Sequence, residues 1–451
     1  MRNNYKNTLV CILIGFCFLW TGSAYLTWLY HLLDFYPTSA VDIYSEVIGY
    51  LFQILGLILF SVYIKKKHKP SSTAYASVIV LFADLIFMVF SVLSPNGPCC
   101  LIFGYLMNLF HGIVAGIYLT KLTTHVTQQN KGIVFGIGYG VGSIGSWVLS
   151  LLGSNNFLKS HYSLILYAIF VLISAIILHV ISGSSTDESS SSRQEISFAP
   201  SIIVLAAITV FFLSFVKSIG FYFPMADLSD SSVNLELSRA FYAFGLVVAG
   251  IVNDKNRKWG AVCCIAALIF PFIMLLLRSN LSSSLVLWIL SYVFFGLFSA
   301  YRVIVFSDMA GKSSQYLYLA GLGLLFGRCG DVSGTVLGIF LKNDIIPLVF
   351  ASSVSFAVTV FLFMLFAQKI YVPISPEEKN TETILEEFGR LYQLSPREIE
   401  VFRLVIEGCS NAEIADNLFI SENTVKFHMK NLLKKTSCTN RSNLIALFKE
   451  Q

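Results

Sequence analysis

Apolar segments about 20 residues long, the length that a helix needs to cross the hydrocarbon core of a membrane, recur along most of the chain. Only 13% of the 451 residues are charged, about half of the share in soluble proteins. We count about twelve such segments, at 8–29, 44–64, 74–93, 99–120, 133–153, 163–182, 200–219, 236–252, 260–277, 284–303, 316–341 and 345–367. They predict an all-α fold whose larger part is a polytopic twelve-helix transmembrane bundle.

Positive charge is distributed unevenly over the loops between these segments. With a cytoplasmic N-terminus, the inner loops hold Arg2, Lys6, Lys65, Lys66, Lys67, Lys69, Lys121, Lys131, Arg193, Lys255, Arg257, Lys258, Arg302 and Lys312. The outer loops hold little beyond Lys159, Lys217, Arg278 and Lys342. Cytoplasmic loops of membrane proteins carry the excess of Lys and Arg. We therefore expect a multi-pass protein of the inner (cytoplasmic) membrane, with both termini in the cytoplasm.

A Ser-rich stretch divides the predicted bundle in two. Residues 182–195 are SGSSTDESSSSRQE, a composition typical of flexible linkers. We expect a first six-helix half at 1–183, a cytoplasmic linker at 184–199 and a second half at 200–368. Glycines of the fifth and eleventh segments recur at a constant offset and indicate a repeat: Gly136 with Gly321, Gly138 with Gly323, Gly142 with Gly327, Gly145 with Gly330 and Gly153 with Gly338. Such glycines allow neighbouring helices to approach closely.

Twelve helices in two repeated halves resemble the major facilitator superfamily of transporters. The loop GIVNDKNRK, from Gly250 to Lys258, is similar to that family's G-xxx-D-(R/K)-x-G-R-(R/K) loop without its second Gly. The corresponding loop of the first half, Lys65 to Lys69, keeps the positive charge but has neither Gly nor Asp. In the family this loop helps to set the balance between two access states, so these departures argue against a working transport cycle.

The last 80 or so residues lack long apolar runs and carry helix-start signals instead. Residues 369–393 contain Pro373 and Pro376 and predict a tether followed by a short amphipathic helix. Ser395 has the spacing of an N-cap, with Pro396 at the first helical position and Glu398 three residues past the cap. Gly408 is expected to end this helix. Asn411 and Ser421 are expected to cap the next two helices.

The third of these helices is predicted to have two distinct faces. Val425, Met429 and Leu432 recur at helical spacing and should face a core. Three lysines, Lys426, Lys430 and Lys434, recur four residues apart and form a basic stripe. A helix that enters the major groove of DNA needs this combination, since its apolar side holds it and its basic side meets phosphates and base acceptors.

The segment from Leu394 to Leu444 carries an ordered set of motifs: LSPRE, GCSNAEIA, ISENTVKFH and the pair Asn440-Arg441. It resembles the helix-turn-helix domain of LuxR/NarL-type bacterial transcription regulators, over residues 394–451, and implies double-stranded DNA as a partner. The resemblance implies base contacts from Lys426, Phe427 and Lys430, nearby phosphates for Thr424, His428 and Lys434, further DNA contacts from Asn411 and Arg441, and a homodimer contact from Leu444, Ile445 and Phe448. The chain departs from the family at Thr436, where Leu is usual, and at Phe427, which we expect to contact thymine methyl groups.

Ionisable residues within the predicted spans are the candidates for a ligand cavity: Asp84, His111, Arg328 and Asp331. A charge at bilayer depth is costly, so it usually faces a cavity or a partner. Arg328 and Asp331 are three residues apart and can pair on one helix face. The residues leave two interpretations open, a ligand-binding cavity and a structural pair that tethers helices. We expect Arg302 and Asp308 to lie at the inner membrane interface, with their charges reaching water.

Three functions are compatible with the sequence. The first is a membrane-embedded transcription regulator whose transmembrane part senses an unknown small molecule. The second is a secondary transporter with a fused regulatory DNA-binding domain. The third is an interaction platform whose helix-turn-helix has lost DNA binding, against which the basic stripe argues. The residues suggest no catalytic constellation, no cofactor and no metal-ligand spacing among the nine Cys, so we expect a non-enzymatic protein.

Overall fold

Every regular element that the structure describes is a helix. The structure is a computed structural model that describes residues 2–66, 73–153, 161–183, 200–226, 235–270, 281–341, 345–370, 381–406 and 408–449. It divides into a membrane unit, Met1–Tyr371, and a C-terminal unit, Val372–Gln451. Several predicted features lie outside the described residues: the linker at 184–199, Pro373 and Pro376 of the tether, and the loop charges Lys67, Lys69, Lys159, Arg193, Arg278 and Lys342.

In the membrane unit, a described helix corresponds to each predicted segment. These elements are α1 (Arg2–Leu32), α2, η1 and α3 (Thr38–Asp42, Ile43–Gly49, Tyr50–Lys66), α4 (Thr73–Val92), α5 (Gly97–His125), η3 (Gln128–Asn130), α6 (Lys131–Gly153), α7 (His161–Gly183), α8 (Pro200–Ala226), α9 (Leu235–Lys255), α10 (Arg257–Ala267), α12 (Leu281–Ala310), η4 and α13 (Ser314–Gly321, Leu322–Leu341) and α14 (Ile345–Ile370). Within the described residues, ten spans are long and apolar enough to cross a membrane. The two remaining segments are α9 and α10, of which α10 has 11 helical residues.

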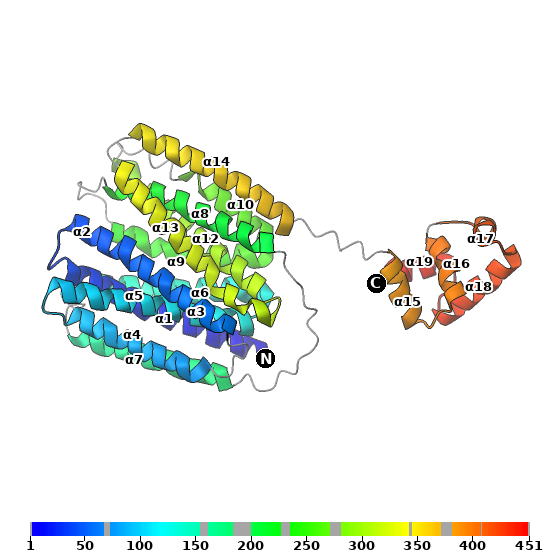
Figure 1. Ribbon diagram of the computed structural model, residues 1–451, viewed down its shortest axis with the longest axis horizontal. Coiled ribbons are helices and arrows are strands. Elements are labelled where there is room, and N and C mark those ends of the chain that lie inside the picture. Colours follow the sequence, from blue (N-terminus) through cyan, green and yellow to red (C-terminus); the bar gives the residue numbers. More distant parts are fainter. Residues whose placement is uncertain are drawn as a thin grey trace. The chain divides into compact units, whose positions relative to one another are not determined.

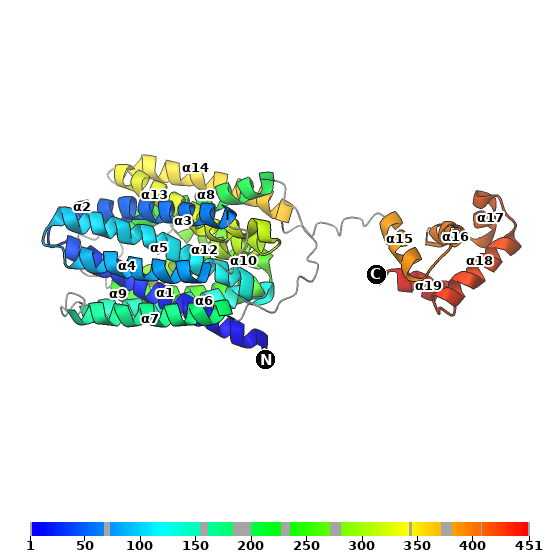
Figure 2. The same ribbon diagram turned by 60° about the horizontal axis from the view of Figure 1, so that its bottom comes forward.

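The helices of the membrane unit run side by side as one bundle, with α7 and α14 at opposite edges in both views (Figures 1 and 2). Glycines allow the closest contacts, as the sequence predicted. A Cβ on Gly142 of α6 would lie 2.6 Å from the Gly15 carbonyl oxygen of α1. A Cβ on Gly330 of α13 would lie 2.2 Å from the Phe211 carbonyl oxygen of α8. Each glycine-rich helix therefore packs against the first helix of its own half.

The C-terminal unit consists of α15 (Thr381–Leu391), α16 (Pro396–Ile406), α17 (Asn411–Leu418), α18 (Glu422–Lys435) and α19 (Arg441–Lys449). Its core includes an aromatic cluster from three helices. The Phe388 ring of α15 lies 4.9 Å from the Phe402 ring of α16 and 5.4 Å from the Phe448 ring of α19. We had predicted α15 as part of a tether before the domain, but Phe388 is fully buried, so α15 belongs to the core.

Side-chain caps set the helix boundaries of this unit. Ser395 and Glu398 form the predicted reciprocal pair, in which each backbone N–H donates to the other residue's side chain. Gly408 has a φ of 91°, a conformation that suits Gly after a helix end. Ser421 caps α18 as predicted. The cap of α17 is a correction: Ser410 holds it in a capping box with Glu413, and Asn411 is the first helical residue.

The aromatic cluster predicts where the C-terminal unit is sensitive to substitution. Phe402→Ala in the 372–451 fragment should lower the free energy of unfolding by about 3–5 kcal/mol, since it leaves a cavity between three helices. Urea unfolding followed by circular dichroism measures this. Phe427→Ala is the matched control, because Phe427 is 60% exposed. Equal losses in the two variants would contradict this packing.

Candidate DNA-binding surface and interior polar clusters

Helix α18 presents its basic stripe to solvent and its apolar side to the core. Val425 and Leu432 are fully buried and Met429 is 8% exposed, whereas Lys426, Lys430 and Lys434 are exposed. The Lys426 ammonium has an ion-pair distance of 4.0 Å to Glu422, with both side chains more than half exposed. A pair of this kind contributes little free energy, so Lys426 can exchange Glu422 for an acceptor on DNA.

The other residues predicted at bases and phosphates also lie on α18. Phe427 is 60% exposed, so its ring is accessible to a partner, and it lies 5.6 Å from the ring of the half-buried His428. The Thr424 hydroxyl lies 2.8 Å from the Ser421 hydroxyl. Both hydroxyls are at the N-terminus of α18, where helix N–H groups favour phosphate.

Two further residues that the resemblance places near DNA have positions within the C-terminal unit that the sequence did not predict. The Arg441 guanidinium donates to the carbonyl oxygens of Val405 and Cys409, where it ties the start of α19 to the end of α16. Arg441 is half-buried. The half-buried Asn411 begins α17 behind the Ser410 cap. The sequence motif identifies Arg441 but does not show its partners. Only the fold shows that the Arg441 guanidinium donates hydrogen bonds to carbonyl oxygens at the end of α16.

The predicted homodimer contact is also corrected by the structure. Leu444 is fully buried and Phe448 is 7% exposed, and both belong to the core of the C-terminal unit. Ile445 is half-buried against the same core. The helical pattern of α19 was recognised, but its apolar face covers the aromatic cluster formed with α15 and α16. Leu444 and Phe448 are therefore not available to a second copy while this core is intact.

Glu398 has a second role that sequence reasoning missed. Its carboxylate, besides capping α16, accepts a hydrogen bond from the Lys435 ammonium at 2.7 Å. Lys435 also donates to the Gln393 carbonyl oxygen. Glu398 is 4% exposed, so this contact fixes the last turn of α18 on α16. Lys435 directly follows the predicted stripe in sequence, and only the fold distinguishes it from Lys434.

Four polar side chains meet around Asp331 inside the membrane unit. The Asp331 carboxylate lies 2.6 Å from the Lys217 ammonium of α8, 3.1 Å from the Arg302 guanidinium of α12 and 3.9 Å from the Arg328 guanidinium on its own helix. The Ser218 hydroxyl donates to the same carboxylate at 3.1 Å. We call Lys217, Arg302, Arg328 and Asp331 the Asp331 cluster.

For two members of this cluster, Lys217 and Arg302, the sequence predicts a different location in the protein. Lys217 was assigned to an outer loop, but α8 continues to Ala226 and places it inside the helix. Arg302 was expected at the inner membrane interface, but it is 5% exposed and pairs with Asp331. Both errors have the same cause. Each residue lies within the last few positions of a predicted span (200–219 and 284–303), where a charge is expected to reach water, and hydropathy does not detect an opposite charge on another helix.

The other two cavity candidates form a separate pair. His111 Nε2 lies 3.5 Å from Asp84 Oδ1, both side chains are buried, and the alignment does not make a hydrogen bond. The Trp20 ring packs edge-on against His111 at 5.6 Å between ring centroids. The structure thus brings together Arg328 with Asp331 and Asp84 with His111, and no described contact joins the two pairs.

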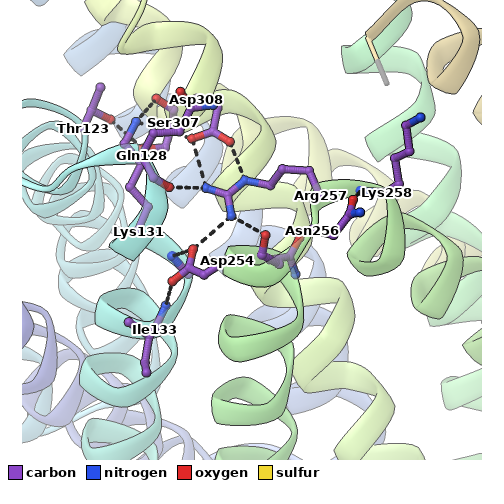
Figure 3. Close-up of polar contacts among 12 residues, drawn as sticks. Thr123, Gln128, Lys131, Ile133, Asp254, Asn256, Arg257, Lys258, Ser307 and Asp308 are labelled. Carbon is purple, nitrogen blue, oxygen red and sulfur yellow. Dashed lines mark hydrogen bonds and ion pairs between the residues drawn. The ribbon is translucent and has the colours of Figure 1, made fainter. Parts of the chain in front are cut away.

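A second polar cluster joins the two halves (Figure 3). It lies at the end of the bundle where α6 begins and α9 and α12 end. The Asp254 carboxylate of α9 accepts hydrogen bonds from the backbone N–H groups of Gly132 and Ile133, at the start of α6. Arg257 bridges Asp254 and Asp308, and it also donates to the Gln128 carbonyl oxygen of the first half.

Lys131 completes this cluster. Its ammonium donates to the Ser307 carbonyl oxygen at 2.7 Å and lies 3.5 Å from Asp308. We call Lys131, Asp254, Arg257 and Asp308 the end network. Asp254 and Arg257 come from the loop that resembles the major facilitator motif. The missing second Gly of that motif therefore does not prevent contact between the halves.

Comparisons with known proteins agree with the two-part architecture. Residues 392–448 match the family of bacterial regulatory proteins called the luxR family. The chain is 48% identical over 61 residues to a nitrate/nitrite response regulator homologue of Haemophilus influenzae, which covers 14% of this chain and 29% of that protein. It is 49% identical over 53 residues to the CsgBAC operon transcriptional regulatory protein of Escherichia coli, which covers 12% and 24% of the two chains. The chain thus spans less than a third of the length of these relatives.

The membrane unit is similar in fold to a solved transporter. The crystal structure of a fucose:proton symporter of Escherichia coli matches with a TM-score of 0.56 and 12% identity, over 82% of this chain and 100% of the symporter. At this identity the likeness shows the fold alone. The predicted LuxR-type helix-turn-helix domain and the major facilitator-like architecture are both confirmed.

The Glu398–Lys435 contact predicts a pH dependence of the C-terminal unit. Burial alone would raise the pKa of Glu398, but hydrogen bonds from Lys435 and the Ser395 backbone N–H outweigh it and hold the pKa below its ordinary value of 4.5. A depressed carboxyl pKa stabilises the folded state above the unfolded pKa. The contribution should therefore be lost as the pH falls from about 4.5 through the lower folded pKa. Urea midpoints of the 372–451 fragment measured between pH 3 and pH 7 test this, and Glu398→Gln should flatten part of the slope. An unchanged slope would contradict the assignment.

Proposed function

We propose that this protein is a membrane-embedded transcription regulator that binds an operator in double-stranded DNA through α18. The observation that carries the proposal is the exposure of Lys426, Phe427 and Lys430 on one surface of a helix whose opposite side is buried. Lys side chains donate to guanine O6 and N7, and an aromatic ring contacts thymine methyl groups. Lys434 and the Ser421–Thr424 hydroxyls are positioned at the flanks for phosphate contacts.

The proposed DNA-bound form is a homodimer. Dimeric helix-turn-helix proteins bind two half-sites about 10 base pairs apart. Because Leu444 and Phe448 are buried in the core, the pairing surface uses side chains other than these two. The membrane unit supports the pairing as well, because holding the DNA-binding units in a plane raises their effective concentration toward one another.

The membrane unit is the proposed sensor of a small molecule. Its orientation follows from the positive charge of the loops, which favours cytoplasmic N- and C-termini in the inner membrane. The end network would then face the cytoplasm and hold the two halves closed on that side. A ligand can shift this state only through different affinities for the open and closed forms. No part of this proposed role requires catalysis, so we propose a non-enzymatic regulator.

A second candidate function is a secondary transporter that carries a regulatory DNA-binding domain. The fold of the membrane unit and the contacts of Asp254 and Arg257 across the halves favour it. The first-half loop favours the sensor, since its sequence from Lys65 to Lys69 has neither the Gly nor the Asp that Gly250 and Asp254 supply in the second half. The interaction-platform alternative is the least supported, because α18 keeps its exposed basic stripe.

DNA binding by the 372–451 fragment tests the first proposal. Lys426→Ala and Lys430→Ala should each weaken operator binding by about 1–3 kcal/mol, and the double variant should abolish the footprint. The operator is first selected from random DNA with the wild-type fragment, and affinities are measured at fixed salt. Arg390→Ala is the matched control, because it removes one exposed positive charge from α15. A footprint that survives the double variant would show that α18 is not the recognition helix.

Uptake into membrane vesicles distinguishes the sensor from the transporter. Compounds that change expression from the operator are tested for accumulation in vesicles that contain the full-length protein. The sensor proposal predicts uptake equal to that of empty vesicles. Uptake above that level that is lost in Asp331→Asn, at equal protein abundance, would overturn it in favour of the transporter.

A further inference from the structure

We propose that the Asp331 cluster is the sensor site and that its ligand is a small organic anion whose carboxylate or phosphate group binds Arg328 and Lys217. This inference rests on the proposed sensing function and adds the chemical class of the ligand. It follows from the charge balance of the cluster, the unused hydrogen-bond donors, the exposure of two cations and the position of the site between the halves.

The charge balance leaves the cluster positive. Three cations, Lys217, Arg302 and Arg328, surround the single carboxylate of Asp331. Glu46 of η1 is a second carboxylate within electrostatic range of Lys217 and Arg328. Even with Glu46 charged, one positive charge remains without a counter-charge among these residues. Such an excess at bilayer depth is costly unless an anion offsets it.

Two donors of the cluster are unused. The Nε atoms of Arg302 and Arg328 are buried and have no hydrogen-bond partner. More than nine in ten buried polar groups in proteins have a partner, so orphaned donors gathered around one carboxylate require an explanation. Guanidinium groups bind carboxylate and phosphate through paired N–H donors, which an acceptor on a ligand would satisfy here.

Two of the cations keep solvent-accessible surface although they lie well inside their helices. The side chains of Arg328 and Lys217 are 20% and 17% exposed, whereas those of Arg302 and Asp331 are both 6% exposed. Arg328 is near the middle of the Ser314–Leu341 span. A charged side chain at this depth faces an interior aqueous space rather than lipid. Asp331 and Arg302 thus form the base of the site, and Arg328 and Lys217 are its accessible donors.

The first half contributes an aromatic wall to this site. The Arg328 guanidinium lies over the Tyr50 ring at 4.0 Å from the ring centroid, and the Tyr25 ring is stacked near Tyr50 at 6.0 Å. Tyr50 begins α3, whereas Arg328 is on α13 of the second half. A ligand bound to Arg328 would therefore touch both halves. Its affinity would differ between states in which the halves move relative to each other, which is the condition for a sensor.

Gly327 of α13 leaves room for the Arg302 guanidinium between α12 and α13. A Cβ on Gly327 would lie 2.5 Å from Arg302 Nη1. A side chain at this position would push Arg302 away from Asp331. The Gly-rich sequence of α13 thus serves the polar cluster as well as helix packing.

Thermal unfolding of the detergent-purified full-length protein tests the proposal. The probes are lactate, succinate, glucose 6-phosphate and inorganic phosphate, compared with lactamide, succinamide and glucose at constant ionic strength. At least one anion should raise the unfolding temperature in a saturable manner, and its uncharged counterpart should not. In Arg328→Gln and Lys217→Gln the apparent affinity should be at least tenfold weaker, and Arg328→Lys should recover part of it. Lys121→Gln, which removes a buried positive charge that donates a hydrogen bond to Ser182, should leave the affinity unchanged.

The outcomes separate the possibilities. If no anion of the set stabilises the protein, or if uncharged counterparts stabilise it equally, the anion proposal is wrong. If Arg328→Gln lowers the unfolding temperature without changing the shift caused by the anion, the cluster is only a structural tether. If an uncharged compound binds in an Arg328-dependent manner, the sensing function stands and the ligand class is wrong.

Discussion

The membrane unit places one carboxylate, Asp331, among three cationic side chains from three helices. Each of these charges would cost about 2.5–3.5 kcal/mol alone at the bilayer centre on insertion scales. Together they fix α8, α12 and α13 against one another, because loss of the Asp331 carboxylate would leave three cations without the counter-charge that they share. Gly327 of α13 leaves the space that the Arg302 guanidinium occupies beside Asp331.

The end network gives the bundle a second set of contacts, at the end where α6 begins. Asp254 and Arg257 tie the second half to the first through backbone groups of Gly132, Ile133 and Gln128. In the proposed mechanism, an anion bound near Arg328 shifts the balance between states in which this network is closed and states in which it is broken. The change reaches DNA as a change in how two C-terminal units are presented to paired half-sites.

The sequence predicted the structure best where a feature depends only on local residues. Apolar length located the helices of the membrane unit, and Ser395, Gly408 and Ser421 marked helix boundaries through local hydrogen bonds or backbone conformation. Prediction was poorer where a contact depends on distant segments. Lys217 and Arg302 meet Asp331 across three helices, and Phe448 packs on Phe388 of a helix that we had placed outside the domain. These contacts join residues that are far apart in the sequence, so no local sequence pattern predicts them.

In the proposed mechanism, the charge balance of the Asp331 cluster controls DNA binding by the C-terminal unit. The most direct test is expression of a reporter placed behind the selected operator, in cells that contain full-length wild-type protein or Lys217→Gln at equal membrane abundance. Lys217→Gln removes part of the excess positive charge and leaves the 372–451 fragment unaltered. Reporter expression is expected to differ severalfold between the two proteins, and a Lys426→Ala/Lys430→Ala double variant is expected to remove the difference. Equal expression from wild type and Lys217→Gln, with and without an anion that stabilises the wild-type protein, would contradict this mechanism.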